Sequence, residues 1–291
     1  MPNKYINPFT DFGFKRIFGE PLSKEMLIDF LNQLLVEEEG KITDLSYLQP
    51  EQLGGTAYDR RAVYDLYCEN QKGEKFIVEM QKGRQTYFKD RSIFYSSFPI
   101  QQQAIQGKNW NFKLKAIYTV ALLDFVFEDD ASDLDKMLYK VKLTDIETQK
   151  VFYDKLTYVY IEMPKFNKTE EELVTRFDMW LYVLKNLPLL DHYPDKLKDR
   201  IFKRLFQRAE IAAFTSEERI SYEDSMKTYR DLKNVIDTAF DEGKAEGLAE
   251  GEARGKAEEK RKMAKIMKAE GDSVSKIARL TDLSEEEVNL L

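Results

Sequence analysis

Residues 62–82, AVYDLYCENQKGEKFIVEMQK, constrain the fold most, because they predict a β-hairpin with an acidic side chain in the centre of each strand. Residues 62–69 and 75–82 are rich in Val, Ile, Tyr and Phe, and residues 70–73 between them have the composition of a tight turn. Two antiparallel neighbouring strands are therefore expected here.

The period of two along each strand places Asp65 on one face of its strand, and it places Glu79 and Gln81 together on the next strand. A carboxylate within a buried sheet is costly unless it is paired, hydrogen-bonded or bound to a cation. Neighbouring strands would bring Asp65 and Glu79 together, with Gln81 beside them. An ion pair with arginine and a solvated sheet face are the two alternatives to a metal site.

Composition restricts the metal that such a site would bind. The chain has one cysteine, Cys68, and one histidine, His192, which excludes a Cys-rich or His-rich zinc site and an internal disulfide framework. Any metal would therefore have oxygen ligands, which suits Mg²⁺ or Mn²⁺.

The pattern of Asp65 on one strand and Glu79-Met80-Gln81 on the next resembles the PD-(D/E)XK nuclease superfamily, in which Glu-x-Lys is usual. Three flanking segments are similar to the Rpn family of recombination-promoting nucleases and transposases. They are residues 11–18 (DFGFKRIF), 91–95 (RSIFY) and 162–166 (EMPKF).

The resemblance implies a role for each of several residues. Asp65, Glu79 and the backbone carbonyl of Met80 would hold Mg²⁺ or Mn²⁺, and Gln81 would take the place of the superfamily's lysine as a catalytic residue. Substrate DNA would be contacted by Arg91, Tyr95, Lys15 and Asp11.

The residues themselves leave simpler interpretations open. Asp11 and Lys15 are four apart on an expected helix and would also pair at the surface. Arg91 and Tyr95 share one face of a helix that would also pack on the sheet with its polar edge in water.

The expected elements follow the order of a restriction-endonuclease-like αβββαβ core of the α/β (α+β) class, with one additional strand. Helices are predicted at residues 11–18, 24–36, 88–106 and 131–141, with Pro99 kinking or splitting the third. Strands are predicted at residues 42–48, 62–69, 75–82, 116–124 and 157–164.

Charge is distributed in a way that permits a DNA-binding cleft. The net charge is −7, but residues 1–125 carry 16 Lys and Arg against 16 Asp and Glu. Lys82, Arg84, Lys89 and Arg91 follow the hairpin, as a phosphodiester substrate would require. No apolar run is long enough to cross a membrane, and the first residues lack the apolar core of a signal peptide, so we expect a cytoplasmic protein without a membrane partner.

Four domains are predicted along the chain. A nuclease-like core at 1–166 is followed by a helical extension at 167–241, a spacer at 242–257 and a small tail at 258–291. The spacer repeats EGKA, EGLA, EGEA and RGKA, which indicates a frayed, solvated helix or, alternatively, a helix pair packed through its glycines.

The tail resembles a small helix-turn-helix, with Ser284 and Glu287 as the capping box of its last helix. Glutamates at 285–287 would repel phosphate at the start of that helix, so a protein contact or a relic of a DNA-binding unit is favoured over base readout. We expect self-association through this C-terminal region, by a face containing Ile266, Ile277, Leu280 and Val288.

The sequence thus predicts a Mg²⁺-dependent DNA endonuclease, acting in recombination or mobile-element contexts. The alternative is a nuclease fold that has lost catalysis and serves as a DNA- or protein-binding protein, because Gln81 carries no positive charge where the superfamily has lysine.

Overall fold

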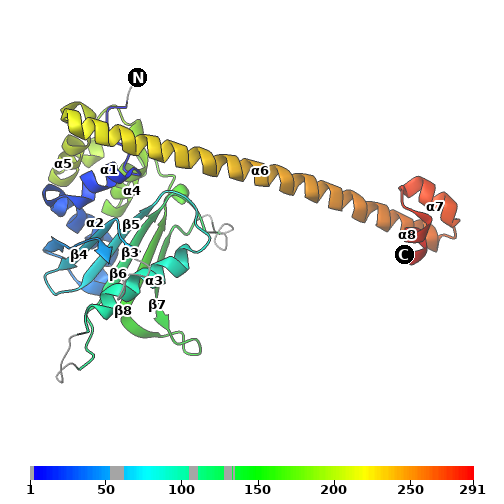
Figure 1. Ribbon diagram of the computed structural model, residues 1–291, viewed down its shortest axis with the longest axis horizontal. Helices are drawn as coiled ribbons and strands as arrows, with labels where there is room; N and C mark the ends of the chain where they lie inside the picture. Colours follow the sequence, from blue (N-terminus) through cyan, green and yellow to red (C-terminus); the bar gives the residue numbers. More distant parts are fainter. Residues whose placement is uncertain (1–2, 53–61, 105–110, 128–132, 134) are drawn as a thin grey trace. The chain divides into compact units, whose positions relative to one another are not determined.

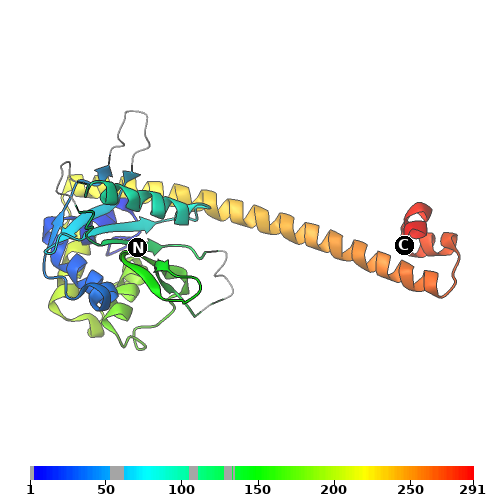
Figure 2. The same ribbon diagram turned by 90° about the horizontal axis from the view of Figure 1, so that it is seen from below.

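The computed structural model describes residues 3–52, 62–104, 111–127, 133 and 135–291, which divide into two compact units, Met1–Lys233 and Asn234–Leu291. The first unit is built on a mixed sheet with helices on both faces (Figures 1 and 2). The second consists of short helices packed on the end of a long one. None of the helices described here is both long and apolar enough to cross a membrane.

The first unit contains both helices and strands. The strands are β1 (Leu45–Tyr47), β2 (Glu51–Gln52), β3 (Ala62–Val63), β4 (Leu66–Asn70), β5 (Lys75–Gln81), β6 (Ile117–Leu123), β7 (Leu138–Thr144) and β8 (Val151–Glu162). The α-helices are α1 (Asp11–Phe14), α2 (Lys24–Glu39), α3 (Phe88–Gln101), α4 (Arg176–Asn186), α5 (Arg200–Ala209) and the first part of α6 (Ser216–Ala269). A π-helical turn, Lys15–Gly19, continues α1, and 3₁₀ turns lie at Pro21–Ser23, Met163–Lys165, Leu187–Leu189, Asp195–Leu197 and Ile211–Ala213.

The main sheet has the strand order β1-β4-β5-β6-β8-β7. The β4–β5 hairpin is antiparallel, with Tyr67 opposite Ile77, whereas β5, β6 and β8 run parallel. Strand β6 is buried along its whole length, as its unbroken apolar run predicts. The arrangement confirms the restriction-endonuclease-like fold, since α2, β1, β4, β5, α3 and β6 follow one another in the predicted αβββαβ order.

Each face of this sheet packs against different helices. Phe76, Val78 and Met80 of β5 join the main core, to which α2, α4 and α5 contribute. On the opposite face, Ile77 packs in a cluster with residues of α3. The views in Figures 1 and 2 agree with this layering. Glu79 and Gln81 are related to Ile77 by the strand period and therefore lie on the α3 face.

The first strand of the predicted hairpin is divided, which corrects the expectation for residues 62–69. Ala62 and Val63 pair with β2 in a separate two-stranded sheet, and β4 begins only at Leu66. Between them the backbone N–H of Tyr64 donates to the carbonyl of Pro50, and that of Asp65 donates to the Glu79 carboxylate. Asp65 therefore lies in a bend rather than at a strand centre.

The prediction of a helix at residues 131–141 is also wrong for the residues of this range that the structure describes. Leu138–Thr144 forms β7, whose alternating sequence LYKVKLT pairs with β8. Residues 131, 132 and 134 lie outside the described residues. The third predicted helix, 88–106, ends as α3 at Gln101 and continues through Pro99; its last predicted residues, 105 and 106, are not described.

The second unit contains the end of α6 together with α7 (Val274–Thr281) and α8 (Glu285–Leu290). Its buried core consists of Ala264, Met267, Ile277 and Val288. Gly271, with φ of 88°, follows α6, and the predicted capping box of Ser284 and Glu287 opens α8. The EGxA spacer is helical as predicted, and α6 is continuous through it.

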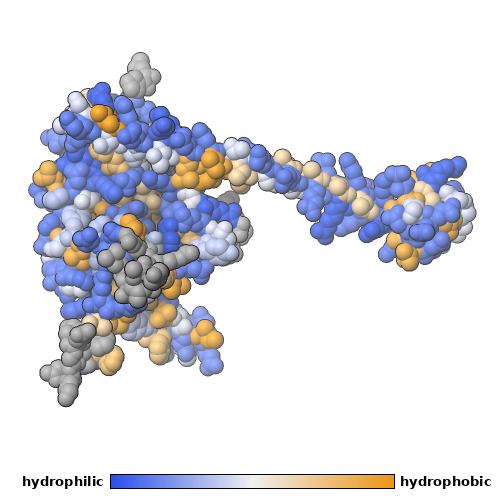
Figure 3. All heavy atoms as spheres, in the orientation of Figure 1, coloured by the Kyte–Doolittle hydropathy of each residue, from blue (hydrophilic) through white to orange (hydrophobic). Residues whose placement is uncertain are grey.

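Hydrophobic residues are also exposed on this unit, among them Ile266 and Leu280. Figure 3 shows hydrophobic groups on the surface of the C-terminal unit among hydrophilic ones. Ile277 and Val288 do not contribute to that surface, which corrects the predicted association face, because they are buried inside the unit.

Candidate active site

The candidate site lies at the carboxyl end of β5, where Glu79 and Gln81 point to the α3 face. Glu79 is only 6% exposed, and its neighbours in the sequence, Val78 and Met80, are buried apolar residues. The flanking register is fixed by Leu66 opposite Val78 in β4 and by Ala121 beside Glu79 in β6. The sheet therefore carries a buried carboxylate near its end.

Asp65 and β5 exchange hydrogen bonds across the bend. The backbone N–H of Met80 donates to the Asp65 carboxylate at 2.7 Å, and the backbone N–H of Asp65 donates to the Glu79 carboxylate at 3.3 Å. Each carboxylate thus accepts a hydrogen bond from the backbone of the segment that carries the other acid. This exchange brings the two acids together, as the sequence predicted.

Arg91 of α3 links Glu79 to Gln81. Its Nη2 donates to Gln81 Oε1 at 2.7 Å and lies 3.6 Å from Glu79 Oε2, while its Nη1 donates to Gln85 at 2.6 Å. The guanidinium carbon lies 5.4 Å from the centre of the Tyr95 ring. Gln81 completes its own bonding by donating to the carbonyl of Gly83 at 3.0 Å. The guanidinium of Arg91 therefore lies beside the Gln81 amide.

Burial changes the protonation of both acids. Removal from water, together with the charge of the neighbouring Asp65, raises the pKa of Glu79 to about 8 against the lowering effect of Arg91. Removal from water also raises the pKa of Asp65, against the lowering effect of the hydrogen bond from the Met80 backbone. The site therefore holds two acids whose charged forms are poorly solvated.

These residues fit a hard divalent cation. The described residues contain no group of three or more His, Cys, Asp or Glu side chains arranged around a metal position, so the protein would offer two carboxylates and the Met80 carbonyl. Mg²⁺ commonly binds through one or two carboxylates and keeps waters or substrate oxygens as its other ligands. Its charge would offset the unfavourable burial of Asp65 and Glu79.

Asp11 and Lys15 pair with each other near the surface, at 3.0 Å, as the simpler interpretation predicted. They also lie close enough to the site to affect it, because the Asp11 charge raises the pKa of Asp65 and the Lys15 charge lowers it. The two interpretations are therefore compatible. Neither side chain has a direct hydrogen bond to Asp65 among those of the described residues.

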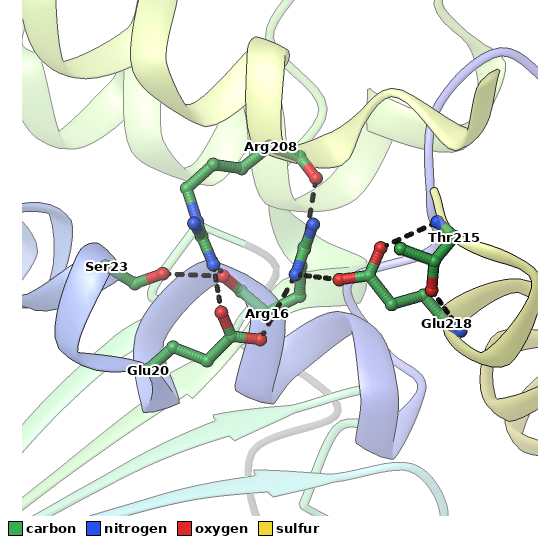
Figure 4. Close-up of polar contacts among 6 residues, drawn as sticks. All are labelled: Arg16, Glu20, Ser23, Arg208, Thr215 and Glu218. Carbon is green, nitrogen blue, oxygen red and sulfur yellow. Dashed lines mark hydrogen bonds and ion pairs between the residues drawn. The ribbon is translucent and has the colours of Figure 1, made fainter. Parts of the chain in front are cut away.

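A network of arginines and acids holds this N-terminal segment on the body of the unit (Figure 4). Arg16 Nη1 lies 2.7 Å from Glu218 of α6, and Arg16 and Arg208 each donate to the other's backbone carbonyl. Glu20 contacts both arginines. The anchoring fixes α1, and with it the position of Asp11 and Lys15.

Sequence reasoning did not assign Gln85 or Lys82 to the site, although it named Lys82 among the basic residues that follow the hairpin. Gln85 holds Arg91, and Lys82 is half-buried close to Asp65 and Asp11. Removal from water lowers the pKa of Lys82, while Asp11 and Asp65 raise it. The basic composition after the hairpin was the available signal for Lys82, whereas Gln85 had none.

Comparison with known protein families gives a match that covers most of the chain. Residues 8–239 match the family described as PD-(D/E)XK nuclease family transposase. The chain belongs to this family. The resemblance noted from the sequence is thereby confirmed, and the matched range includes every predicted site residue of this PD-(D/E)XK family member. Comparisons with curated proteins and with solved structures gave no match.

Proposed function

We propose that this PD-(D/E)XK family member is a Mg²⁺- or Mn²⁺-dependent endonuclease that hydrolyses phosphodiester bonds of DNA, in a recombination or mobile-element context. The observation that carries the proposal is the convergence of Asp65 and Glu79, cross-linked by backbone hydrogen bonds, with Arg91 beside them. Membership in a nuclease family supports the reaction class.

The roles of the residues follow from their chemistry. Asp65, Glu79 and the Met80 carbonyl would hold the cation, which when bound polarises the phosphate and lowers the pKa of an attacking water. Arg91 presents a guanidinium, a group suited to phosphate oxygens. Gln81 keeps that guanidinium in place through its 2.7 Å hydrogen bond and does not itself add charge.

Glu79 must lose its proton to bind the cation. Because its pKa is raised to about 8 in the protein without metal, metal binding competes with a proton and releases it. We therefore expect the apparent affinity for Mg²⁺ to rise as the pH rises towards 8.

A second candidate function is DNA or protein binding without catalysis. It is favoured by the position of Arg91, which lies 3.6 Å from Glu79 and supplies positive charge to that acid without any metal. The absence of a lysine at position 81 points in the same direction.

Plasmid nicking distinguishes the two functions. We expect cutting in Mg²⁺, none in EDTA, and at least a hundredfold loss in the isosteric variants Asp65→Asn and Glu79→Gln, each checked for folding by circular dichroism. Asp154→Asn is the matched control, because Asp154 is an exposed acid on β8 of the same sheet.

Equal cutting in EDTA, or by both site variants, would contradict the proposed chemistry. A wild-type protein that binds DNA but does not cut it in Mg²⁺ or Mn²⁺ would instead support the second function.

A further inference from the structure

A cavity of about 790 Å³ lies between the segment that follows β5 and the exposed side of α3. It is lined by Arg84, Tyr87, Asp90, Arg91, Phe94 and Tyr95, among others. Its volume is in the range of sites for small organic molecules, about 300–1,000 Å³. Because Arg91 also contacts Gln81 and Glu79, the cavity adjoins the candidate active site.

Aromatic rings form an exposed platform in this cavity. Tyr87 is 74% exposed and Phe94 is 43% exposed. Phe94 is braced from within the helix, since its ring centre lies 5.3 Å from that of Phe98 and 6.3 Å from that of Tyr95. Rigid exposed rings of this kind bind nucleobases by stacking, with little regard to sequence.

Charge in the cavity matches the rest of a nucleotide. Arg84 and Arg91 bring guanidinium groups, which bind phosphate oxygens and also stack on flat rings. Asp90 adds an acceptor of the type that binds the amino group of cytosine. Rings for a base and guanidinium groups for a phosphate thus lie within one cavity.

We propose that this cavity binds one nucleobase that is out of the DNA stack, so that DNA with an unpaired nucleotide beside the scissile phosphate is the preferred substrate. In a duplex the neighbouring base pairs cover both faces of each base, and the rings reach a base only after it has left the stack. The position of the scissile phosphate rests on the proposed function, whereas base binding by the cavity can be measured without cleavage.

The test compares two DNA duplexes that differ by one base. Each carries a single bulged nucleotide, which is a cytidine in one duplex and an abasic residue in the other. Binding to the full-length protein is measured by fluorescence anisotropy in EDTA, where the proposed reaction does not proceed. We expect the wild type to bind the cytidine bulge about fivefold or more tightly than the abasic bulge, the lower end of the effect of one stacked base.

Variants assign that preference to the cavity. Phe94→Ala and Tyr87→Ala should each lose most of the preference for the cytidine bulge, while Tyr87→Phe should keep it because the ring remains. Ile93→Ala is the matched control, since Ile93 is 59% exposed on the same helix and does not belong to the lining.

Equal wild-type affinity for the two bulges would overturn the inference, and so would an equal loss in Ile93→Ala. Cleavage in Mg²⁺ is scored separately on the same duplexes. Cutting without a base preference refutes the cavity proposal alone, and a base preference that depends on Phe94 without cutting refutes the proposed reaction alone.

Discussion

Glu79 holds a proton in the folded protein at pH values where it is ionised in the unfolded chain. Its pKa rises from 4.5 to about 8, so the folded state binds more protons between these values. The free energy of unfolding must then fall as the pH rises through this window, by at most about 1.4 kcal/mol per unit from this group. The raised pKa of Asp65 acts in the same direction.

We predict that Glu79→Gln flattens this pH dependence and is more stable than the wild type at pH 8, because an amide has no charge to desolvate. Urea unfolding between pH 5 and pH 8 in EDTA measures both effects. Asp154→Asn should follow the wild-type curve. A Glu79→Gln protein with the wild-type slope would show that Glu79 is not protonated in the folded state.

The hydrogen bond between Gln81 and Arg91 yields a second prediction. Gln81→Lys would place an ammonium group beside the guanidinium that the amide now accepts from at 2.7 Å. We expect this variant to lose stability, and Arg91→Gln to restore part of it, because the double variant again pairs one cation with one amide. The coupling in a urea double-mutant cycle should be about 0.5–3 kcal/mol.

The pair Asp154→Asn and Gln81→Lys serves as the control cycle. Additive effects of Gln81→Lys and Arg91→Gln would mean that the two side chains do not interact in solution.

For individual residues, the sequence predicted which side chains come together but not the hydrogen bonds that hold them in place. Strand alternation and a short turn are local, so Asp65, Glu79 and Gln81 were found from spacing alone. The exchange between Asp65 and the Met80 backbone was not predictable, because it requires the bend that ends β3 before β4 begins. Gln85 belongs to no periodic pattern in the sequence, and it joins the site only because the folded chain places Arg91 within hydrogen-bonding distance of it.

Among the elements, α1 depends on a glycine for its close contact with the chain before it. A Cβ atom at Gly13 would lie 2.0 Å from the backbone oxygen of Asn7. We predict that Gly13→Ala destabilises the protein by about 1–3 kcal/mol, because the backbone must shift to relieve the overlap. Thermal unfolding followed by circular dichroism would measure the loss.

The matched control is Gly247→Ala in α6, where nothing lies within 4 Å of the added Cβ. There the same substitution should favour helix by up to about 1 kcal/mol, since alanine has the higher helix propensity. Opposite signs at the two sites are the expected result. A neutral effect at Gly13 would show that the segment from Asn7 to α1 is less tightly packed than described.

Elements with a single strong pattern were predicted well, and elements with mixed patterns were not. The apolar run of β6 predicts a single structure, a strand that is buried on both faces of the sheet. Leu138–Thr144 alternates as a strand does, but its lysines and leucine also fit a helix, and only pairing with β8 decides between them. That pairing involves residues up to Ile161 and is not a local property.

For the whole molecule, the C-terminal unit is where we expect self-association. The family match ends at residue 239, so nearly all of Asn234–Leu291 lies beyond it. Ile266 is 52% exposed and Leu280 is 54% exposed in a unit with a small buried core. We predict that Ile266→Glu with Leu280→Glu lowers the mass in solution to that of a monomer, because charge opposes the burial of these exposed positions.

Light scattering over a range of concentrations gives the mass. Ser275→Glu adds a negative charge at another exposed position of α7 and should leave the mass unchanged. An oligomer that survives the double substitution would assign the interface to Met1–Lys233 instead.

The cost of burying Glu79 also bears on how such a chain changes over generations. An amide at this position has no charge to desolvate. A single Glu79→Gln substitution would therefore stabilise the folded protein while it removes an acid from the site. Selection removes mainly the substitutions that leave a protein less stable than its function requires, so a stabilising substitution is opposed only where it costs function. If the proposed reaction is what requires Glu79, a lineage that no longer carries out this reaction should lose the carboxylate readily.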